Sequence, residues 1–179
     1  MDISKIAIGK NSPNDVNVII EVPLGSDPIK YEVDKDSGAL VVDRFLQTAM
    51  FYPCNYGFIP HTLSDDGDPA DVLVIGLHPV QPGAVMSVRP VGVLLMEDEA
   101  GMDEKILAVP SSKLQPFYDN VQNIEDVPQV LRSQISHFFE HYKDLEKNKW
   151  VKVIGWEGKE KAQELIVQAI DAEKKAKAA

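Results

Sequence analysis

The feature that most constrains the fold is a series of short apolar segments separated by proline, glycine and polar turns. Segments of this kind cover residues 16–22, 30–33, 40–44, 71–76, 85–96 and 105–109. Pro23 ends the first segment, the turn DKDSGA joins the second to the third as a hairpin, and Pro90 is expected to break the fifth. Short strands at this spacing favour a small antiparallel barrel over a parallel sheet.

The last third of the chain changes to helical periodicity. Pro128 marks the expected start of an amphipathic helix, because the first turn of a helix does not need its N–H. The apolar stripe of that helix is Leu131, Ile135, Phe138, Tyr142 and Leu145. After a short strand at 150–154, a second stripe is formed by Ala162, Leu165, Ile166, Ala169 and Ile170. The tail AEKKAKAA is expected to be solvated, so the sequence predicts an α+β fold in which helices pack on a barrel.

Composition narrows the class of protein. At about 150 residues per domain, 179 residues predict one domain spanning 1–179. The formal charge of −10 argues against nucleic-acid and membrane partners, which bind through Lys and Arg. Cys54 is the only cysteine, which excludes an intramolecular disulfide and a thiolate zinc site. With no secretory signal and no apolar run near 18 residues, we expect a soluble cytoplasmic protein.

Carboxylates are concentrated just before one predicted strand. The segment DDGDPAD at 65–71 holds four aspartates in seven residues, and oxygen ligands of this kind suit a hard cation such as Mg²⁺, Mn²⁺ or Ca²⁺. A solvated acidic turn is an equally simple interpretation. An EF-hand is excluded, because counting from Asp66 puts Asp71 at position six and Leu77 at position twelve. A catalytic metal site needs further carboxylates, and the loop EDEAGMDE at 97–104 supplies them unless both loops are merely exposed tips.

Cationic and phenolic side chains are also present in the predicted strands and helix. Lys30 and Glu32 share one strand face, and Arg44 lies on the partner strand. The remaining candidates are Lys105 after the second acidic loop, the pair Tyr142-Lys143, and Tyr52 and Tyr56, which bracket an expected Pro-Cys-Asn loop. Each alone is typical of a surface residue. There is no Walker A motif, so a P-loop is excluded.

Together these segments resemble a known family. The string DGDPAD resembles the signature of the first family of soluble inorganic pyrophosphatases, in its compact bacterial form. The resemblance extends, in order and spacing, through DPIKYEVDKDSGALVVDRF, TAMFYPCNYGFIPHTL, EDEAGMDEK and HFFEHYKDLEKNKWVKV, from about Ile19 to Trp156. One departure is Ala70, where the signature has a larger aliphatic residue, and we expect it to alter packing and not activity.

The resemblance implies a five-stranded OB-like barrel with flanking helices, assembled as a homohexamer. It also implies hydrolysis of pyrophosphate to two phosphates by a metal-activated water, with several Mg²⁺ ions per site and Mn²⁺ or Zn²⁺ as possible substitutes. The implied metal ligands are Asp66, Asp71, Asp103, Asp98 and Glu32, and the implied general base is Asp68. The implied phosphate ligands are Lys30, Arg44, Tyr56, Tyr142 and Lys143, with Glu21, Tyr52 and Lys105 in supporting positions.

Two other functions are weighed against this interpretation. His137 and His141 match the inverted zinc-peptidase motif HxxEH, but a third ligand is needed, and a packing or subunit-interface role is the simpler interpretation. An OB barrel that binds nucleic acid would need basic and aromatic faces, whereas this chain is acidic and only 7% aromatic. Metal-dependent release of phosphate would separate these functions from hydrolysis.

Overall fold

Five strands close into a barrel in the computed structural model, which describes residues 1–178. They are β1 (Val16–Val22), β4 (Asn55–Phe58), β5 (Asp71–Val74), β8 (Lys105–Pro110) and β6 (Val85–Asp98). Each strand pairs with the next in this order, and β6 pairs back with β1. The predicted five-stranded OB-like barrel is therefore confirmed. Its strands are not all antiparallel, however, because β5 and β8 run parallel.

The longest strand, β6, joins the parts of the sheet. Residues 85–88 of β6 pair with β1, residues 88–94 pair with β8, and residues 92–98 pair with β9 (Val151–Gly158). The predicted break at Pro90 is wrong, because the strand continues and only its register with β8 shifts between Pro90 and Gly92. Such a bulge tolerates the missing N–H of proline and bends the strand around the barrel. The short β7 (Gly101–Met102) returns along the end of β6.

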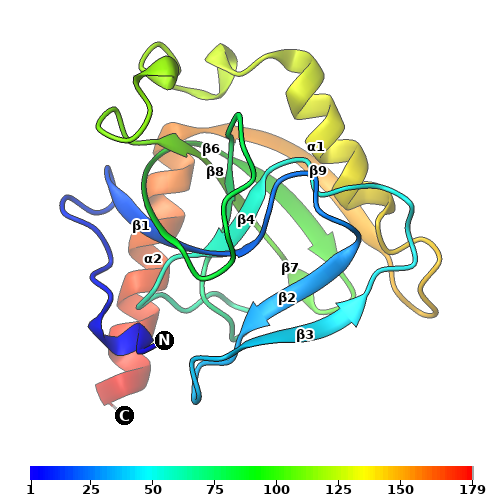
Figure 1. Cartoon of the computed structure of the whole chain (residues 1–179), viewed down its shortest axis with the longest axis horizontal. Helices are drawn as coiled ribbons and strands as arrows, with labels where there is room; N and C mark the ends of the chain where they lie inside the picture. Colours follow the sequence, from blue (N-terminus) through cyan, green and yellow to red (C-terminus); the bar gives the residue numbers. More distant parts are fainter. Residues whose placement is uncertain (179) are drawn as a thin grey trace.

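A separate hairpin lies against the barrel. It consists of β2 (Ile29–Val33) and β3 (Leu40–Phe45), which within residues 1–178 pair only with each other. Both strands and their turn follow the prediction within two residues. In Figure 1 the hairpin lies apart from the closed ring of strands, with its turn at the end of the molecule that also holds the N-terminus.

Strand β4 is missing from the prediction, which treats Pro53 to Asn55 as a loop. It is only four residues long and contains Gly57, a residue depleted in strands. The glycine is required by a close approach of two backbones: a Cβ there would stand 2.0 Å from the carbonyl oxygen of Ile19 on β1. Contact with the neighbouring strand, not the local pattern, therefore determines this element.

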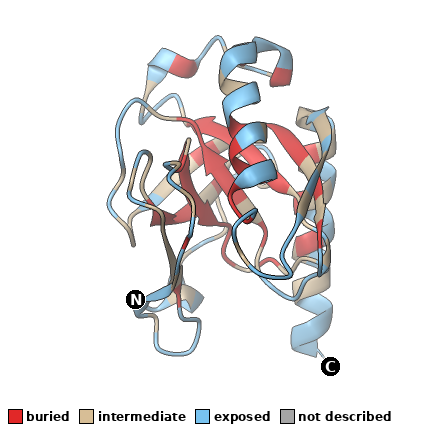
Figure 2. Ribbon diagram, turned by 90° about the vertical axis from the view of Figure 1, so that its right-hand side faces the viewer, coloured by how far each residue is buried: buried red, intermediate tan, exposed pale blue. Residues whose placement is uncertain are grey.

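Two helices pack on the barrel, and each contributes buried residues to a different one of the two main hydrophobic clusters. Helix α1 (Gln129–His141) buries Ile135, Phe138 and Phe139, while α2 (Lys159–Ala178) buries Ala162, Ile166 and Ala169. Successive residues of β5 and β8 alternate between the two cores, as the period of a strand requires. Figure 2 shows the buried strands between helices whose outer faces are exposed. Single 3₁₀ turns lie at Ile3–Lys5, Pro116–Tyr118 and Ile124–Asp126.

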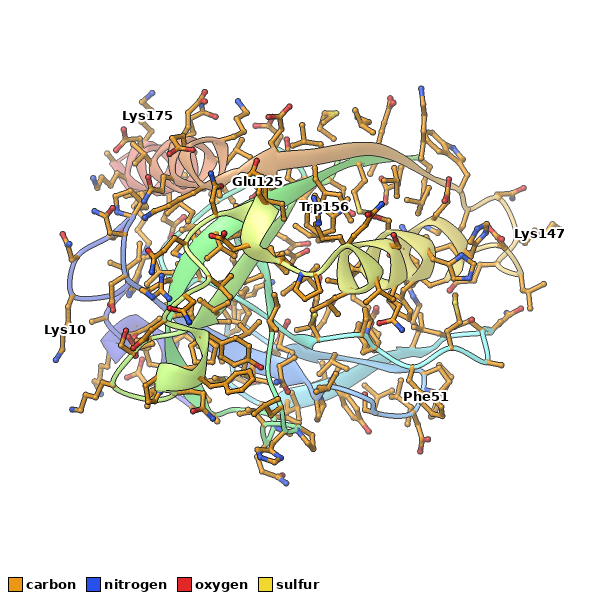
Figure 3. The ribbon with its side chains drawn as sticks, turned by 90° about the horizontal axis from the view of Figure 1, so that it is seen from above. Lys10, Phe51, Glu125, Lys147, Trp156 and Lys175 are labelled. Carbon is orange, nitrogen blue, oxygen red and sulfur yellow. The ribbon has the colours of Figure 1, made fainter. Side chains whose placement is uncertain are left out.

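The helix boundaries differ from the prediction at both C-terminal ends. Helix α1 ends at His141, so Leu145 lies outside it and is 71% exposed, although the apolar stripe through Tyr142 is confirmed. The sequence expected as a solvated tail continues α2 to Ala178, and Ala179 lies outside the described residues. Trp156 on β9 lies beneath α1 and donates from Nε1 to Ser136 Oγ at 3.0 Å (Figure 3). No helix within residues 1–178 is both long and apolar enough to cross a membrane.

Candidate active site

A cavity of about 260 Å³ lies where the β2–β3 hairpin faces the barrel. Its wall is built from six separate parts of the chain: β1, the hairpin, β4, the segment leading into β5, the β6–β8 connection and the residues that follow α1. The charged and phenolic side chains that line it are Glu21, Lys30, Glu32, Lys35, Arg44, Tyr56, Asp66, Asp68, Asp71, Asp98, Glu99, Asp103, Lys105, Tyr142, Lys143 and Lys149. We call this the acidic cavity.

Residues 59–70, here called the aspartate loop, are held by their own polar groups. The buried Thr62 hydroxyl donates to the carbonyl of Ile59 at 2.6 Å and accepts from the N–H of Ala70 at 2.9 Å, which ties the two ends together. Gly67 has a φ of 90°, a conformation that glycine adopts without strain. The N–H of Asp68 then donates to Asp66 Oδ1 at 3.0 Å. The loop thus places Asp66 and Asp68 in the cavity wall just before the start of β5.

Carboxylates and lysines alternate around the acidic cavity. Lys105 is buried with its Nζ 2.5 Å from both Asp71 and Asp103, and Lys143 Nζ is 2.7 Å from Asp98 Oδ2. The other pairs are Lys30 with Glu32 at 2.5 Å, Lys35 with Asp68 at 2.9 Å, and Lys149 with Glu99. Lysines thus pair with most of the carboxylates of the cavity, whereas no ion pair to Glu21 or Asp66 is present among the described residues.

Burial and mutual repulsion raise the pKa values of several carboxyl and phenol groups in the acidic cavity. Burial raises the pKa of Glu21 to about 8, even though its carboxylate accepts from the N–H of Val33 at 2.7 Å. Partial burial, together with the charges of Asp71 and Asp103, raises the pKa of Asp66. Burial also raises the pKa of Tyr56 well above its usual range, so its hydroxyl stays protonated and can donate.

The basic groups keep their charge for a different reason. Burial disfavours the ammonium of Lys105, but the adjacent Asp71 and Asp103 outweigh it and raise the pKa of this lysine well above its usual range. Arg44 Nε is buried, and within residues 1–178 it has no hydrogen-bond partner; the nearest carboxylate oxygens are those of Glu146 at 3.8 Å and Asp43 at 4.0 Å. The guanidinium of Arg44 thus has two carboxylates within ion-pair distance, although its Nε makes no hydrogen bond within the described residues.

Nearly every residue singled out from the sequence lines this one cavity. The exception is Tyr52, which is buried in the core with its ring 5.8 Å from that of Tyr56 and 4.9 Å from that of Phe138. It supports the wall from behind. Sequence reasoning missed Lys35, Glu99 and Lys149. All three lie inside the segments that carry the resemblance, and only their contacts distinguish them from surface residues.

The two histidines of HxxEH lie elsewhere. The rings of His137 and His141 lie 4.6 Å apart on α1, tilted by 58° to each other, and His141 Nδ1 is 2.8 Å from Asp144 Oδ2. Within the described chain, no three His, Cys, Asp or Glu residues are gathered tightly enough to hold a metal ion as they stand. The geometry therefore lends the zinc-peptidase interpretation no support.

The structure is an OB-like barrel whose cavity combines carboxylate, cationic and phenolic side chains. The family model for inorganic pyrophosphatase matches residues 18–174. An inorganic pyrophosphatase of Bradyrhizobium diazoefficiens is 68% identical, with 99% of each chain covered. The structure also resembles that of an inorganic phosphatase from Anaplasma phagocytophilum, with a TM-score of 0.93, 56% identity, and coverage of 95% of this chain and 99% of that one.

A third similar structure is an inorganic pyrophosphatase from Coxiella burnetii, with a TM-score of 0.91, 53% identity, and coverage of 93% of this chain and 99% of that one. The chain belongs to the inorganic pyrophosphatase family. It is a hydrolase, and the family is metal-dependent.

Proposed function

We propose that the acidic cavity hydrolyses pyrophosphate to two orthophosphates in a reaction that depends on Mg²⁺. The observation that carries the proposal is the alternation of carboxylates with lysines and arginine around one small cavity. Pyrophosphate is a polyanion, and its complex with a divalent cation needs both kinds of partner at once. So many carboxylates would repel an anionic ligand that came without a cation, and a neutral ligand would not need them.

The carboxylates fit a hard divalent cation. We assign Asp66, Asp71 and Asp103 as the principal ligands, with Asp98 and Glu32 as further ligands; all are oxygen donors lining the acidic cavity. Partial burial, and after it the negative charges of Asp71, Asp103 and Asp68, raise the pKa of Asp66, and a bound cation would favour its ionised form. Mg²⁺ keeps several waters and binds through a few carboxylates plus phosphate oxygens, so a loose set of carboxylates suits it, with Mn²⁺ or Zn²⁺ as possible substitutes. When bound, it would supply Lewis-acid polarisation and lower the pKa of a water.

The cations and phenols would bind the phosphates. Lys30, Arg44 and Lys143 present charged donors to the acidic cavity, and Tyr56 and Tyr142 present protonated hydroxyls. Lys105, Glu21 and Tyr52 support the wall. These donors would stabilise the charge that accumulates on the departing phosphate.

Asp68 is proposed as the general base. Its side chain is 66% exposed at the edge of the acidic cavity, whereas Asp71 and Asp103 share the buried Lys105. An accessible carboxylate can take a proton from the attacking water without first breaking a buried ion pair. The neighbouring carboxylates are therefore better suited to holding cations.

The ion pairs also imply how the ligands would enter. Lys30, once released by Glu32, and Lys143, once released by Asp98, would become phosphate donors, and the two carboxylates would become cation ligands. Divalent cation and pyrophosphate should therefore strengthen each other's binding, because each frees the partner that the other needs.

Three wider assignments accompany this proposal. We propose a single pyrophosphatase domain over residues 1–179, a homohexamer, and a cytoplasmic location, without nucleic-acid or membrane partners. The net charge of −10 supports the last point. The exposed pair His137 and His141 on α1 is assigned to a contact between subunits.

The test is phosphate release from pyrophosphate by the purified protein. We expect release with Mg²⁺, none after excess chelator, and recovery when Mg²⁺ is restored. Equal turnover without any divalent cation would contradict the metal requirement. A DNA mobility shift on the same sample should be negative at physiological salt, and a salt-dependent shift without hydrolysis would favour the nucleic-acid alternative.

A further inference from the structure

One contact links the β2–β3 hairpin to the aspartate loop. Lys35 lies in the hairpin turn, and its Nζ donates to Asp68 Oδ1 at 2.9 Å. Both side chains line the acidic cavity. The two residues are 33 positions apart and belong to parts of the structure that share no strand pairing, because β2 and β3 pair only with each other within the described chain.

The hairpin turn is built to hold Lys35 in place. Asp34 Oδ1 accepts from the N–H of Ser37 at 2.8 Å, and the N–H of Gly38 donates to the carbonyl of Asp34 at 2.7 Å. The N-terminal amine of Met1 donates to the carbonyl of Gly38 at 2.9 Å, which anchors the turn from outside. Lys35 therefore extends from a fixed backbone.

Asp68 has a fixed backbone but a nearly free side chain. Its N–H is bonded to Asp66 and its carbonyl accepts from the N–H of Ser64 at 2.7 Å. Among residues 1–178, Lys35 is the only hydrogen-bond donor to its carboxylate, and it occupies Oδ1. Oδ2 is left without a partner. A carboxylate held in this way has one oxygen fixed and one available to accept a proton.

We infer that Lys35 is a positioning residue that holds one oxygen of Asp68 so that the other faces the attacking water. The inference rests on the proposed role of Asp68 as general base. It assigns Lys35 a different task from Lys30 and Lys143, because its contact is with the base and not with a proposed cation ligand. Without Lys35, the exposed Asp68 side chain would sample several rotamers, and only some would be productive.

The expected effect is modest, because both partners are about half exposed or more. Exposed ion pairs contribute little, so Lys35→Met should lower kcat by about two- to fivefold with KM unchanged. Lys35→Arg should restore most of the lost rate, because it also donates to a carboxylate. Lys174→Met is the matched control: Lys174 makes an exposed ion pair with Asp171 on α2, far from the base in sequence, and its loss should leave kcat unchanged.

A double-mutant cycle with Asp68→Asn decides between explanations. If Lys35 acts through Asp68, Lys35→Met should lower kcat in the wild-type background and have no further effect beside Asp68→Asn. An equal fall in both backgrounds, a rise in KM, or an unchanged kcat in the single variant would overturn the inference. Near-wild-type kcat for Asp68→Asn alone would instead overturn the base assignment, and the inference with it.

Discussion

The same residue types form ion pairs in two regions of this molecule with different consequences. On α2, Lys161, Lys174 and Lys177 each pair with an acid three or four residues away, and the lysine side chains are 37% to 71% exposed. In the acidic cavity, Lys105 and Lys143 pair with acids 34 and 45 positions away, at 5% and 7% exposure. Helix geometry alone accounts for the first group, and only the closed barrel produces the second. Burial strengthens the interaction between these charges and makes an unpaired partner costly, which under the proposed function suits the binding of a polyanion together with a cation.

The strongest way to test the catalytic side of this comparison is Asp68→Asn. The amide has nearly the shape of the carboxylate but cannot accept a proton from water at neutral pH, so kcat should fall by about 10²- to 10⁴-fold. Steady-state phosphate release checks this, with an unfolding temperature close to wild type as the control for folding. If kcat stays near wild type, the proton acceptor is another group, with Glu32 the next candidate.

Lys105→Met should lower the free energy of unfolding far more than removal of an exposed lysine on α2. It leaves Asp71 and Asp103 without their buried cation, and removal of one partner of a buried pair typically costs about 3–5 kcal/mol. Denaturant unfolding without divalent cations measures the loss, and added Mg²⁺ should recover part of it. In the same assay, Lys174→Met on α2 should leave stability unchanged. Equal losses for both variants would show that burial does not distinguish the regions.

Within the acidic cavity, Asp71→Ala and Arg44→Ala should change different quantities: the first the Mg²⁺ requirement, the second the KM for pyrophosphate. Loss of a proposed cation ligand should raise the Mg²⁺ concentration needed for half-maximal activity by about 10- to 100-fold, an effect that excess Mg²⁺ partly rescues. Loss of Arg44 should instead raise KM for pyrophosphate, with the Mg²⁺ requirement nearly unchanged. Titrations of both ligands for both variants check this, and identical changes would refute the division of roles.

The smallest expected effect concerns pH. The pKa of Glu21 rises from 4.5 to about 8 in the folded protein, so between these values the folded state holds a proton that the unfolded state has lost. Stability therefore decreases as the pH rises through this window. Glu21→Gln keeps an acceptor for Val33 N–H but removes the titration. Between pH 5.5 and 7.5, denaturant unfolding without divalent cations should show the variant gaining on the order of 1 kcal/mol relative to wild type. Parallel pH profiles would contradict this.

Much of the fold could be predicted because its signals are local. The segments 16–22, 105–109 and the two helical stripes carry their own periodicity, and the structure confirms each within a few residues. Strand β4 carries no such signal, since Gly57 is explained only by its approach to Ile19. Pro90 predicts a break that the pairing of β6 with β8 overrides. The parallel pairing of β5 with β8 depends on barrel closure, which local patterns do not encode.

The amino-acid order specifies the chemistry available to this protein, namely which carboxylates, lysines and tyrosines are present and in which segments. The resemblance carried by those segments also pointed to the family. Folding brings these groups together, places Tyr52 behind the cavity wall, and lets Lys35 reach Asp68 across 33 residues. The physical reason is that charge, volume and period are properties of residues and short segments. Burial, ion pairing and pKa shifts depend on distances between segments, and those exist only once the barrel has closed.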